Sequence, residues 1–436
     1  MNRLWIRMLV VGAILLAPVA RAADGPVKTE IQKTADGQYE LLRDGKPYFI
    51  KGVGGKWSRE TLAKTGANSF RTWHIAEDLE DQLDVAQKNG LTVTVGYWLK
   101  HKEKSFNYSD AAAVAKQFED VKNTVMKYKH HQAVLAWAVG NEMERNNDIP
   151  ELWIHIESLA KVIHEIDPNH PVMTVVAELG GKKVQNINKY CPSLDLIGIN
   201  TYAGGPSVGE RYRKNGGTKP FVLTEFGPAG QWEMPKNKFG AVNELTSTDK
   251  CKWYRNTYEK SVLAFKGTCL GSYAFIWGFK VEATSTWYGM FLPDGSKLAA
   301  VDTMQELWTG KPSDQPCPIM SKLALTGANE VAPGDSIEAI VDVSHPKDGK
   351  LRIEWALCGE QGTYGIAGPD AEAAPVVADA IVENGQKHVT IKMPIARGVY
   401  RIYCYVRNEN GGAAVGSLPV KVGGDAHKGA ATSPSH

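Results

Sequence analysis

Short apolar runs alternate with amphipathic stretches through most of the chain. Each run is rich in β-branched or aromatic residues and has the length of a strand. Between the runs, apolar residues recur at spacings of three and four, as along Leu152, Ile156, Leu159 and Ile163, and predict helices. The expected strands are residues 48–52, 69–73, 91–96, 134–139, 172–176, 194–199, 221–224 and 272–277. Eight strands separated by helices predict an α/β fold, a closed parallel (β/α)8 TIM barrel.

An open, doubly wound sheet is the alternative arrangement for such an alternation. It would need a phosphate-binding glycine loop, but Gly52, Gly54 and Gly55 lack the spacing and the downstream acid of such a loop. Ahead of the first barrel strand, residues 27–50 alternate around two turn sequences, DG and DGKP. We therefore expect a barrel domain over residues 23–310 that begins with a short antiparallel β-hairpin.

The periodicity changes after the barrel. Residues 311–321 are rich in proline, which is typical of a linker. Beyond them, alternating runs separated by turn sequences predict the strands 336–343, 351–357, 388–393, 398–406 and 416–422. We expect an immunoglobulin-like β-sandwich over residues 322–423, docked on the barrel as an accessory domain. Residues 424–436 are small and polar and are expected to be a disordered tail.

Residues 1–22 have the pattern of a secretory signal peptide, in which Arg3 and Arg7 precede an apolar run and a small-residue cleavage site. The run is too short to span a bilayer, so we expect export to the periplasm or the extracellular space without stable membrane insertion. The net charge of +2 includes the arginines of this segment, so the mature chain is almost neutral. A neutral chain has no electrostatic footprint for nucleic acid and suits an uncharged substrate. The oligomeric state is left open.

The six cysteines are an even number in a chain that we expect to be exported, which permits up to three disulfides. Strand parity argues mildly against a bridge between Cys358 and Cys404, and the pairing is left open. Because the sequence has neither a CxxC nor an HExxH motif, it indicates no metal-dependent chemistry. His130 and His131 are expected in a helix-to-strand turn, at the end of the barrel opposite the expected active site. We expect neither a cofactor nor a catalytic metal.

Two strand-length runs, residues 137–142 (WAVGNE) and 221–227 (FVLTEFG), each lead to a glutamate. A barrel strand that buries apolar residues and then presents a carboxylate places it at the active-site rim. Two carboxylates there suffice to cleave a glycosidic bond. We assign Glu142 as the general acid/base and Glu225 as the nucleophile. For Glu142, a structural ion pair with Arg145 is the alternative.

These runs resemble the signatures of glycoside hydrolase clan A, and within it the TIM-barrel domain of family 2. Residues 66–74 (GANSFRTWH) and 199–202 (INTY) are also close to what that family carries. The resemblance implies a retaining mechanism, and it implies that Asn141 hydrogen-bonds the sugar 2-hydroxyl. It covers residues 44–308. Outside that range it fails, because family 2 enzymes usually carry two domains ahead of the barrel, where this chain has a hairpin.

Several further residues are expected to support the two glutamates or to contact the substrate. Glu225 needs a cation and hydrogen-bond donors to stay ionised beside Glu142, and Arg71 and Tyr202 are the expected partners. Family 2 barrels carry both at matching places. The clan places an indole as the floor of the sugar subsite, which corresponds here to Trp277. Candidates that packing would explain equally well are His74, Trp57, Trp73, Trp98, Trp232 and Trp287.

The expected function is that of a retaining β-glycoside hydrolase acting on a neutral β-linked poly- or oligosaccharide by double displacement. The domain order favours an open groove and endo action over exo action. The alternatives are a β-glucan transglycosylase with the same site and a non-catalytic carbohydrate-binding protein. These residues do not set the sugar, the linkage, or the choice between water and sugar as acceptor.

Overall fold

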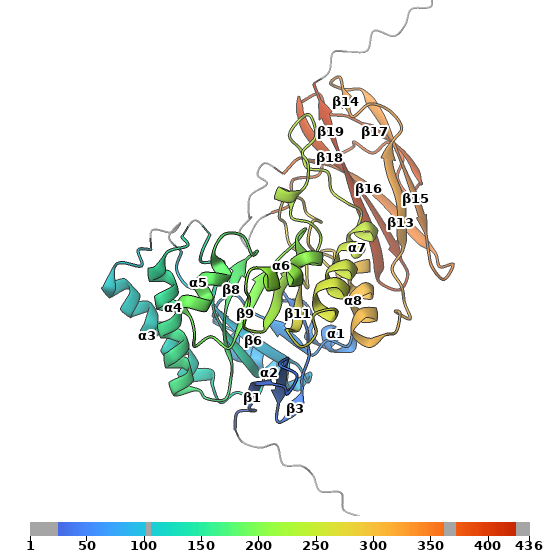
Figure 1. Cartoon of the computed structure of the whole chain (residues 1–436). Coiled ribbons are helices and arrows are strands. Elements are labelled where there is room, and N and C mark those ends of the chain that lie inside the picture. The colour runs from blue at the N-terminus through green and yellow to red at the C-terminus, as the bar shows by residue number, and fades with distance from the viewer. Residues whose placement is uncertain (1–24, 102–105, 146, 362–371, 424–436) are drawn as a thin grey trace, which may run out of the picture.

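The computed structural model describes residues 25–101, 106–145, 147–361 and 372–423, which form a barrel domain and a β-sandwich (Figure 1). The predicted TIM barrel with an N-terminal antiparallel sheet and a C-terminal sandwich is confirmed. Eight parallel strands close in chain order, and the last pairs with the first. They are β4 (Ile50–Gly54), β5 (Ser69–Arg71), β6 (Thr92–Tyr97), β7 (Val134–Asn141), β8 (Val172–Ala177), β9 (Leu196–Asn200), β10 (Phe221–Phe226) and β11 (Cys269–Phe275).

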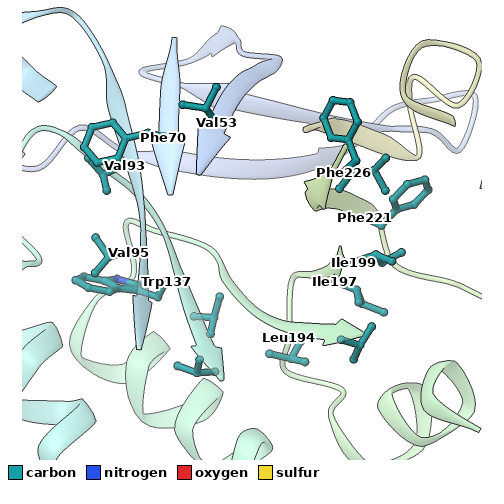
Figure 2. Packing of buried hydrophobic residues seen from close by; sticks show 14 of the residues in the cluster. Val53, Phe70, Val93, Val95, Trp137, Leu194, Ile197, Ile199, Phe221 and Phe226 are labelled. Carbon is teal, nitrogen blue, oxygen red and sulfur yellow. The ribbon is translucent and has the colours of Figure 1, made fainter. Parts of the chain in front are cut away.

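The alternation of side chains along these strands divides the apolar residues into two cores. On β8, Met173 and Val175 point into the barrel, whereas Val172 and Val176 pack against the surrounding helices. Figure 2 shows part of the outer core, where side chains of neighbouring strands point to the same side. Because both faces of each strand are buried, the strands appear in the sequence as continuous apolar runs.

Helices follow the strands and cover the outside of the barrel (Figure 1). They are α1 (Arg59–Lys64), α2 (Leu79–Lys88), α3 (Ala111–Tyr128), α4 (Pro150–Ile166), α5 (Lys183–Tyr190), α6 (Val208–Lys214), α7 (Ser247–Thr257) and α8 (Ala299–Thr309), with the short turns η2 (Gly205–Ser207) and η3 (Gln231–Glu233) and the π-helix η4 (Tyr258–Leu263). The start of α3 is fixed by Asp110, whose carboxylate accepts the amides of Ala112 and Ala113. The start of α4 is a proline, which needs no amide partner there.

A small antiparallel sheet closes the end of the barrel at which the strands begin. It consists of β1 (Thr29–Lys33), β2 (Tyr39–Arg43) and β3 (Lys46–Pro47), so the predicted hairpin has a third, two-residue strand. Leu41 of β2 is buried among the side chains of the barrel interior. Arg43 donates to the carbonyl of Val134 at 3.0 Å and so joins the cap to β7. The opposite end of the barrel, where the strands finish, is the end at which the sequence predicts the active site.

The sandwich has two sheets, one with strand order β12-β19-β18-β16 and β14 beside β19, the other with order β13-β15-β17. Its strands are β12 (Lys297–Leu298), β13 (Ile319–Leu325), β14 (Glu330–Val331), β15 (Ser336–Ser344), β16 (Leu351–Gly359), β17 (His388–Lys392), β18 (Gly398–Asn408) and β19 (Gly412–Val422). Strand β13 begins at Ile319, so the ordered sandwich starts within the segment predicted as a linker. The sandwich lies against α7 and α8 (Figure 1).

All six cysteines are free in the structure, and the permitted disulfides are not formed. Cys404 faces Trp355 across β16 and β18, while Cys358 pairs with Arg401, so the parity argument against a Cys358–Cys404 bridge agrees with the register. Within the described ranges, no helix is both long and apolar enough to cross a membrane. The predicted signal peptide and C-terminal tail lie outside the described residues.

Candidate active site

Both glutamates assigned from the sequence lie at the carboxyl ends of barrel strands, where the pairing register breaks. Glu225 is the fifth residue of β10, and between Leu223 and Glu225 this strand advances two residues while β9 advances one. Strand β7 has a similar irregularity between Ala138 and Asn141, directly before Glu142. A bulge lets consecutive side chains leave the strict alternation of a strand. Adjacent residues can therefore both contribute to the site.

The backbone of Glu142 adopts a left-handed conformation with φ of 55°. This region is unfavourable for a residue with a side chain, and such outliers concentrate at functional sites. The nearby Gly140, with φ of 85°, turns the chain the same way without that cost. The Glu142 amide donates to the carbonyl of Val175 at 2.8 Å, which helps to hold the turn.

Glu225 is buried and accepts hydrogen bonds on both carboxylate oxygens. The indole of Trp73 donates to Oε1 at 2.6 Å, and the hydroxyl of Tyr202 donates to Oε2 at 2.7 Å. The fully buried guanidinium of Arg71 stands 3.5 Å from Oε1. Gly54 makes room for Trp73, because a Cβ there would lie 2.6 Å from the indole. The expected cation and hydroxyl donor are therefore both in place.

Glu142 is held more loosely than Glu225. Its Oε1 accepts from the amide of Asn200 at 2.8 Å, and its Oε2 is 3.2 Å from Arg145, whose side chain is about half exposed. The Glu142 side chain is 18% exposed, against 9% for Glu225. Glu142 thus pairs with Arg145, as the structural alternative required, but it also shares a hydrogen-bond network with the second carboxylate.

Asn200, at the end of β9, joins the parts of this network and was not among the predicted site residues. Its Nδ2 donates to Glu142 and, at 3.2 Å, to Oδ1 of Asn141. Its Oδ1 accepts from Thr224 at 2.8 Å and from Arg71 at 3.3 Å. The signal in the sequence was the same as for the two glutamates, a polar residue that ends a buried apolar strand.

Asn141 lies beside the acid/base candidate with its amide oxygen fully engaged. Oδ1 accepts from Arg71 at 3.0 Å and from Asn200 at 3.2 Å. These two bonds orient the side-chain amide, whose nitrogen has no acceptor among the hydrogen bonds of the described residues. The contact with the sugar that the resemblance implied for Asn141 stays a prediction.

The charges around Glu225 do not balance. Burial raises the pKa of Glu225 above its ordinary value, the Arg71 guanidinium opposes this rise, and the carboxylate of Glu142 adds to it. The hydrogen bonds from Trp73 and Tyr202 favour the ionised form and lower the pKa. Burial also raises the pKa of Tyr202 well above its ordinary range, so its hydroxyl remains a donor.

Trp277 is not the exposed floor of a sugar subsite, and this expectation is corrected. Its side chain is 0% exposed and belongs to the outer core, where its Nε1 donates to the carbonyl of Ser58 at 3.2 Å. The eighth strand ends at Phe275, earlier than predicted, and this ring faces the site. It lies edge-on to Trp73 at 5.9 Å and to Tyr202 at 6.0 Å between ring centroids.

The remaining predicted contacts lie farther from the two carboxylates. Trp57 is partly buried and stacks on Phe291, with ring centroids 5.6 Å apart. Trp98 is 39% exposed and lies beside His101. His74 is exposed and lines a small hollow at the rim with Arg71, Trp73 and Lys56. None of the three donates to or accepts from Glu142 or Glu225 in the hydrogen bonds of the described residues.

Other carboxylates near the rim have structural partners. Glu144 is paired with Lys183 at 2.8 Å, and Glu178 with Arg211 at 2.6 Å. Glu233 accepts two backbone amides. Among the described residues, no group of three His, Cys, Asp or Glu side chains could hold a metal ion. Glu142 and Glu225 are therefore the two carboxylates that this network brings together.

Comparisons with known proteins agree with this description of the barrel. Residues 56–251 match the family model for the TIM barrel domain of glycosyl hydrolases family 2. A β-glucuronidase of Sus scrofa is 26% identical over 193 residues, and one of Felis catus is 25% identical over 196 residues. Each match covers 39% of this chain and 28% of the relative, so the chain corresponds to little more than a quarter of these proteins.

Solved structures of similar fold include two β-glucuronidases. β-Glucuronidase 2 of Bacteroides uniformis, solved with a covalently bound cyclophellitol-6-carboxylate aziridine, has a TM-score of 0.51 and 12% identity over 91% of this chain and 48% of that one. The β-glucuronidase of an uncultured Clostridium sp. has a TM-score of 0.51 and 18% identity over 65% of this chain and 54% of that one. At these identities the likeness is one of fold. By fold and by family model, the barrel of this chain resembles the catalytic TIM-barrel domain of glycoside hydrolase family 2, in clan A, as its motifs predicted.

Proposed function

We propose that the chain is a retaining β-glycoside hydrolase. The observation that carries this proposal is the pair formed by Glu142 and Glu225 at the end of the barrel where the strands finish. One carboxylate is buried and held by donors on both oxygens, whereas the other is more exposed and holds a single amide bond and one surface ion pair. This asymmetry suits a fixed nucleophile and an acid that must exchange its proton with water.

In the proposed reaction Glu225 attacks the anomeric carbon while Glu142 protonates the oxygen of the leaving group. The glycosidic bond breaks, and the sugar is held as an ester of Glu225. Glu142, now ionised, removes a proton from water, which attacks the anomeric carbon and releases the ester. Arg71, Trp73 and Tyr202 stabilise the carboxylate when it is attacking and when it leaves.

The amide of Asn141 fits a contact with the substrate in this scheme. Because Arg71 and Asn200 occupy its oxygen, its nitrogen is the group left to donate to a sugar hydroxyl. A hydrogen bond to the 2-hydroxyl that strengthens in the transition state would contribute to the rate rather than to binding alone.

A glucuronide is a second candidate substrate beside the neutral saccharide expected from the sequence. The relatives of similar sequence and fold are named β-glucuronidases. A sugar carboxylate would need a cation at the rim, and Lys56 lies in the hollow lined by Trp73 and His74. Turnover of p-nitrophenyl β-glucoside and of p-nitrophenyl β-glucuronide, measured side by side, decides between the two substrates. If the glucuronide is preferred, Lys56→Met should remove that preference and leave glucoside turnover unchanged.

The mechanism is tested by covalent labelling and by rescue. A 2-fluoro glycoside with a good leaving group should label Glu225, and NMR of the first-formed product should show retention of configuration. Glu142→Ala should keep turnover of substrates with good leaving groups, and azide should accelerate release of the sugar from the enzyme. Inversion of configuration, or labelling elsewhere, would contradict the assignment. A transglycosylase would transfer the label to an added sugar in preference to water, and a purely carbohydrate-binding protein would not be labelled.

A further inference from the structure

Two exposed tryptophans stand on the face of the barrel that carries the two carboxylates. Among the described residues, the exposed large apolar side chains include Trp98 and Trp232, and none of the others is aromatic. Trp98 directly follows β6, and Trp232 lies in η3 after β10. Trp232 is the more exposed of the two, at 59%. Burying an indole is strongly favourable, so a tryptophan that stays exposed to water calls for an explanation.

The loop that carries Trp232 is fixed on both sides of it. Gln231 is buried and accepts from the hydroxyl of Tyr288 at 2.5 Å. Glu233 accepts from the amide of Gly230 at 2.7 Å and from the amide of Ala203, in the loop after β9, at 2.9 Å. The exposure of Trp232 is therefore not the exposure of a loose loop tip. The chain holds its neighbours in place and leaves its ring in water.

One part of the indole rests on the loop and the rest is free. A Cβ at Gly230 would lie 2.5 Å from the ring, so the absence of a side chain there lets the indole lie against the backbone. The ring meets Tyr202 edge-on, with centroids 5.5 Å apart and an interplanar angle of 88°. Tyr202 is the residue whose hydroxyl donates to Glu225. The exposed indole thus stands one aromatic ring away from the proposed nucleophile.

A rigid, exposed indole beside a reacting carboxylate matches the apolar C–H face of a sugar ring. Because Tyr202 lies between the indole and Glu225, the ring is set back from the sugar that Glu225 attacks. We propose that Trp232 is the stacking platform for a neighbouring sugar unit, so that the substrate is a β-linked oligosaccharide rather than a single sugar on a small aglycone. This inference rests on the proposed glycosidase function and assigns a subsite of that same site.

The test compares substrates that do and do not reach the platform. The p-nitrophenyl β-glycoside turned over fastest is compared with a trisaccharide of the same sugar, using Trp232→Leu and Trp232→Phe. Trp232→Leu should lower kcat/KM for the trisaccharide about tenfold, chiefly through KM, because aromatic stacking is lost. Turnover of the monoglycoside should stay within twofold. Trp232→Phe should restore most of the loss, since it keeps an aromatic face. Ile395→Ala, which truncates a still more exposed apolar residue of the sandwich, is the control and should change neither.

Equal losses on both substrates, or none, would overturn the inference while leaving the glycosidase proposal intact. If the wild type turns over neither substrate, a binding measurement still tests the Trp232 subsite separately from the glycosidase proposal. Calorimetry of the Glu225→Gln protein with cellotriose, laminaritriose and mannotriose should detect binding of at least one. Trp232→Leu in that background should weaken it about tenfold. Binding that is the same with and without the indole would overturn the subsite.

Discussion

Two buried glutamates invite comparison, Glu225 at the barrel mouth and Glu244 at the contact between barrel and sandwich. Their side chains are 9% and 1% exposed. Each accepts a hydroxyl hydrogen bond at 2.7 Å, Glu225 from Tyr202 and Glu244 from Ser417. By burial and hydrogen bonding the two carboxylates are alike, so these properties do not separate the proposed nucleophile from a structural carboxylate.

The charges around the two carboxylates do separate them. Burial alone would raise the pKa of Glu244, but Lys250 at 2.6 Å and the nearby Arg401 hold it below its ordinary value. Burial raises the pKa of Glu225, and one guanidinium at 3.5 Å, Arg71, does not offset it beside a second carboxylate. A carboxylate with surplus cations is stable as an ion, whereas one whose charge is only partly compensated is ready to react.

The largest expected difference is in turnover. Glu225→Gln should lower kcat at least about 10³-fold, because an amide cannot form the glycosyl ester. Glu244→Gln makes the same change of shape and charge at the interface and is the matched control. Its turnover per folded molecule should stay within about tenfold. A comparable loss in both variants would show that charge balance does not distinguish the two sites.

The same two variants should rank in the opposite order when stability is measured. Glu244→Gln should lose more stability than Glu225→Gln. Glu244→Gln leaves Lys250 buried without its counter-ion, with the carbonyl of Thr286 as a remaining acceptor, and should cost about 3 kcal/mol in the free energy of unfolding.

Glu225→Gln also takes the counter-ion from a buried cation, Arg71, but that ion pair is longer, at 3.5 Å. Arg71 keeps its hydrogen bonds to Thr224 and Asn141. Because the change also removes a carboxylate that burial disfavours, it should cost less than Glu244→Gln, about 1 kcal/mol. Chemical denaturation at neutral pH measures both. A larger loss from Glu225→Gln than from Glu244→Gln would contradict the comparison.

The two sites should also respond to acid with opposite signs. The pKa of Glu244 is lowered on folding, so its contribution to stability is present above the unfolded value of about 4.3 and is lost as the pH falls through the folded value. The pKa of Glu225 is raised, so its contribution is lost as the pH rises from about 4.3 through the folded value. Denaturation across this range with each glutamine variant should flatten the corresponding slope.

The pH dependence of kcat/KM on its acid side reports on Glu225 more directly than stability does. Tyr202→Phe removes a hydrogen bond that lowers the pKa of Glu225, so the acid limb of kcat/KM should move up by about one pH unit. Tyr403→Phe, at the interface, removes a hydroxyl that accepts the amide of Ser285 at 3.4 Å and should leave the limb in place. A shift with Tyr403→Phe, or none with Tyr202→Phe, would break the link between Glu225 and the pH profile.

The smallest effect is expected at the hydroxyl that the sandwich supplies. Ser417→Ala removes a hydroxyl that donates to Glu244 and accepts from Arg401 at 3.0 Å, and it should cost about 1–2 kcal/mol of stability, with turnover unchanged. Ser321→Ala, which loses an exposed bond to the carbonyl of Asp342, is the control and should cost less. An equal cost at both positions would show that the buried bonds add nothing.

Local patterns of the sequence were sufficient for most of the fold. Buried parallel strands are continuous apolar runs, so residues 134–139 and 221–224 were found within two residues of the observed ends of β7 and β10. The positions of the two glutamates could be predicted as well, because a polar residue that ends such a strand lies at the rim of the barrel. The expected partners Arg71 and Tyr202 end up in contact with Glu225 for the same reason.

The errors arose where distant parts of the chain decide the outcome. Phe275 and Trp277 both lie near the end of the eighth strand, and no local pattern tells which ring faces the mouth. Phe291, from a later loop, covers Trp277 and buries it. The interface at Glu244 could not be predicted either. Its partners come from α7 and from β19, and nothing in the sequence joins them in advance.

The order in which the chain visits the two domains has an evolutionary consequence. It leaves the barrel to form β12, which pairs in parallel with β19 of the sandwich, then returns to build α8 on the barrel before entering β13. A module fused at one junction could be exchanged by a single recombination event. Here a single breakpoint after α8 would separate β12 from β19, the strand with which it pairs. Barrel and sandwich should therefore be inherited together, and chimaeras should succeed only when Lys297–Leu298 travels with the sandwich.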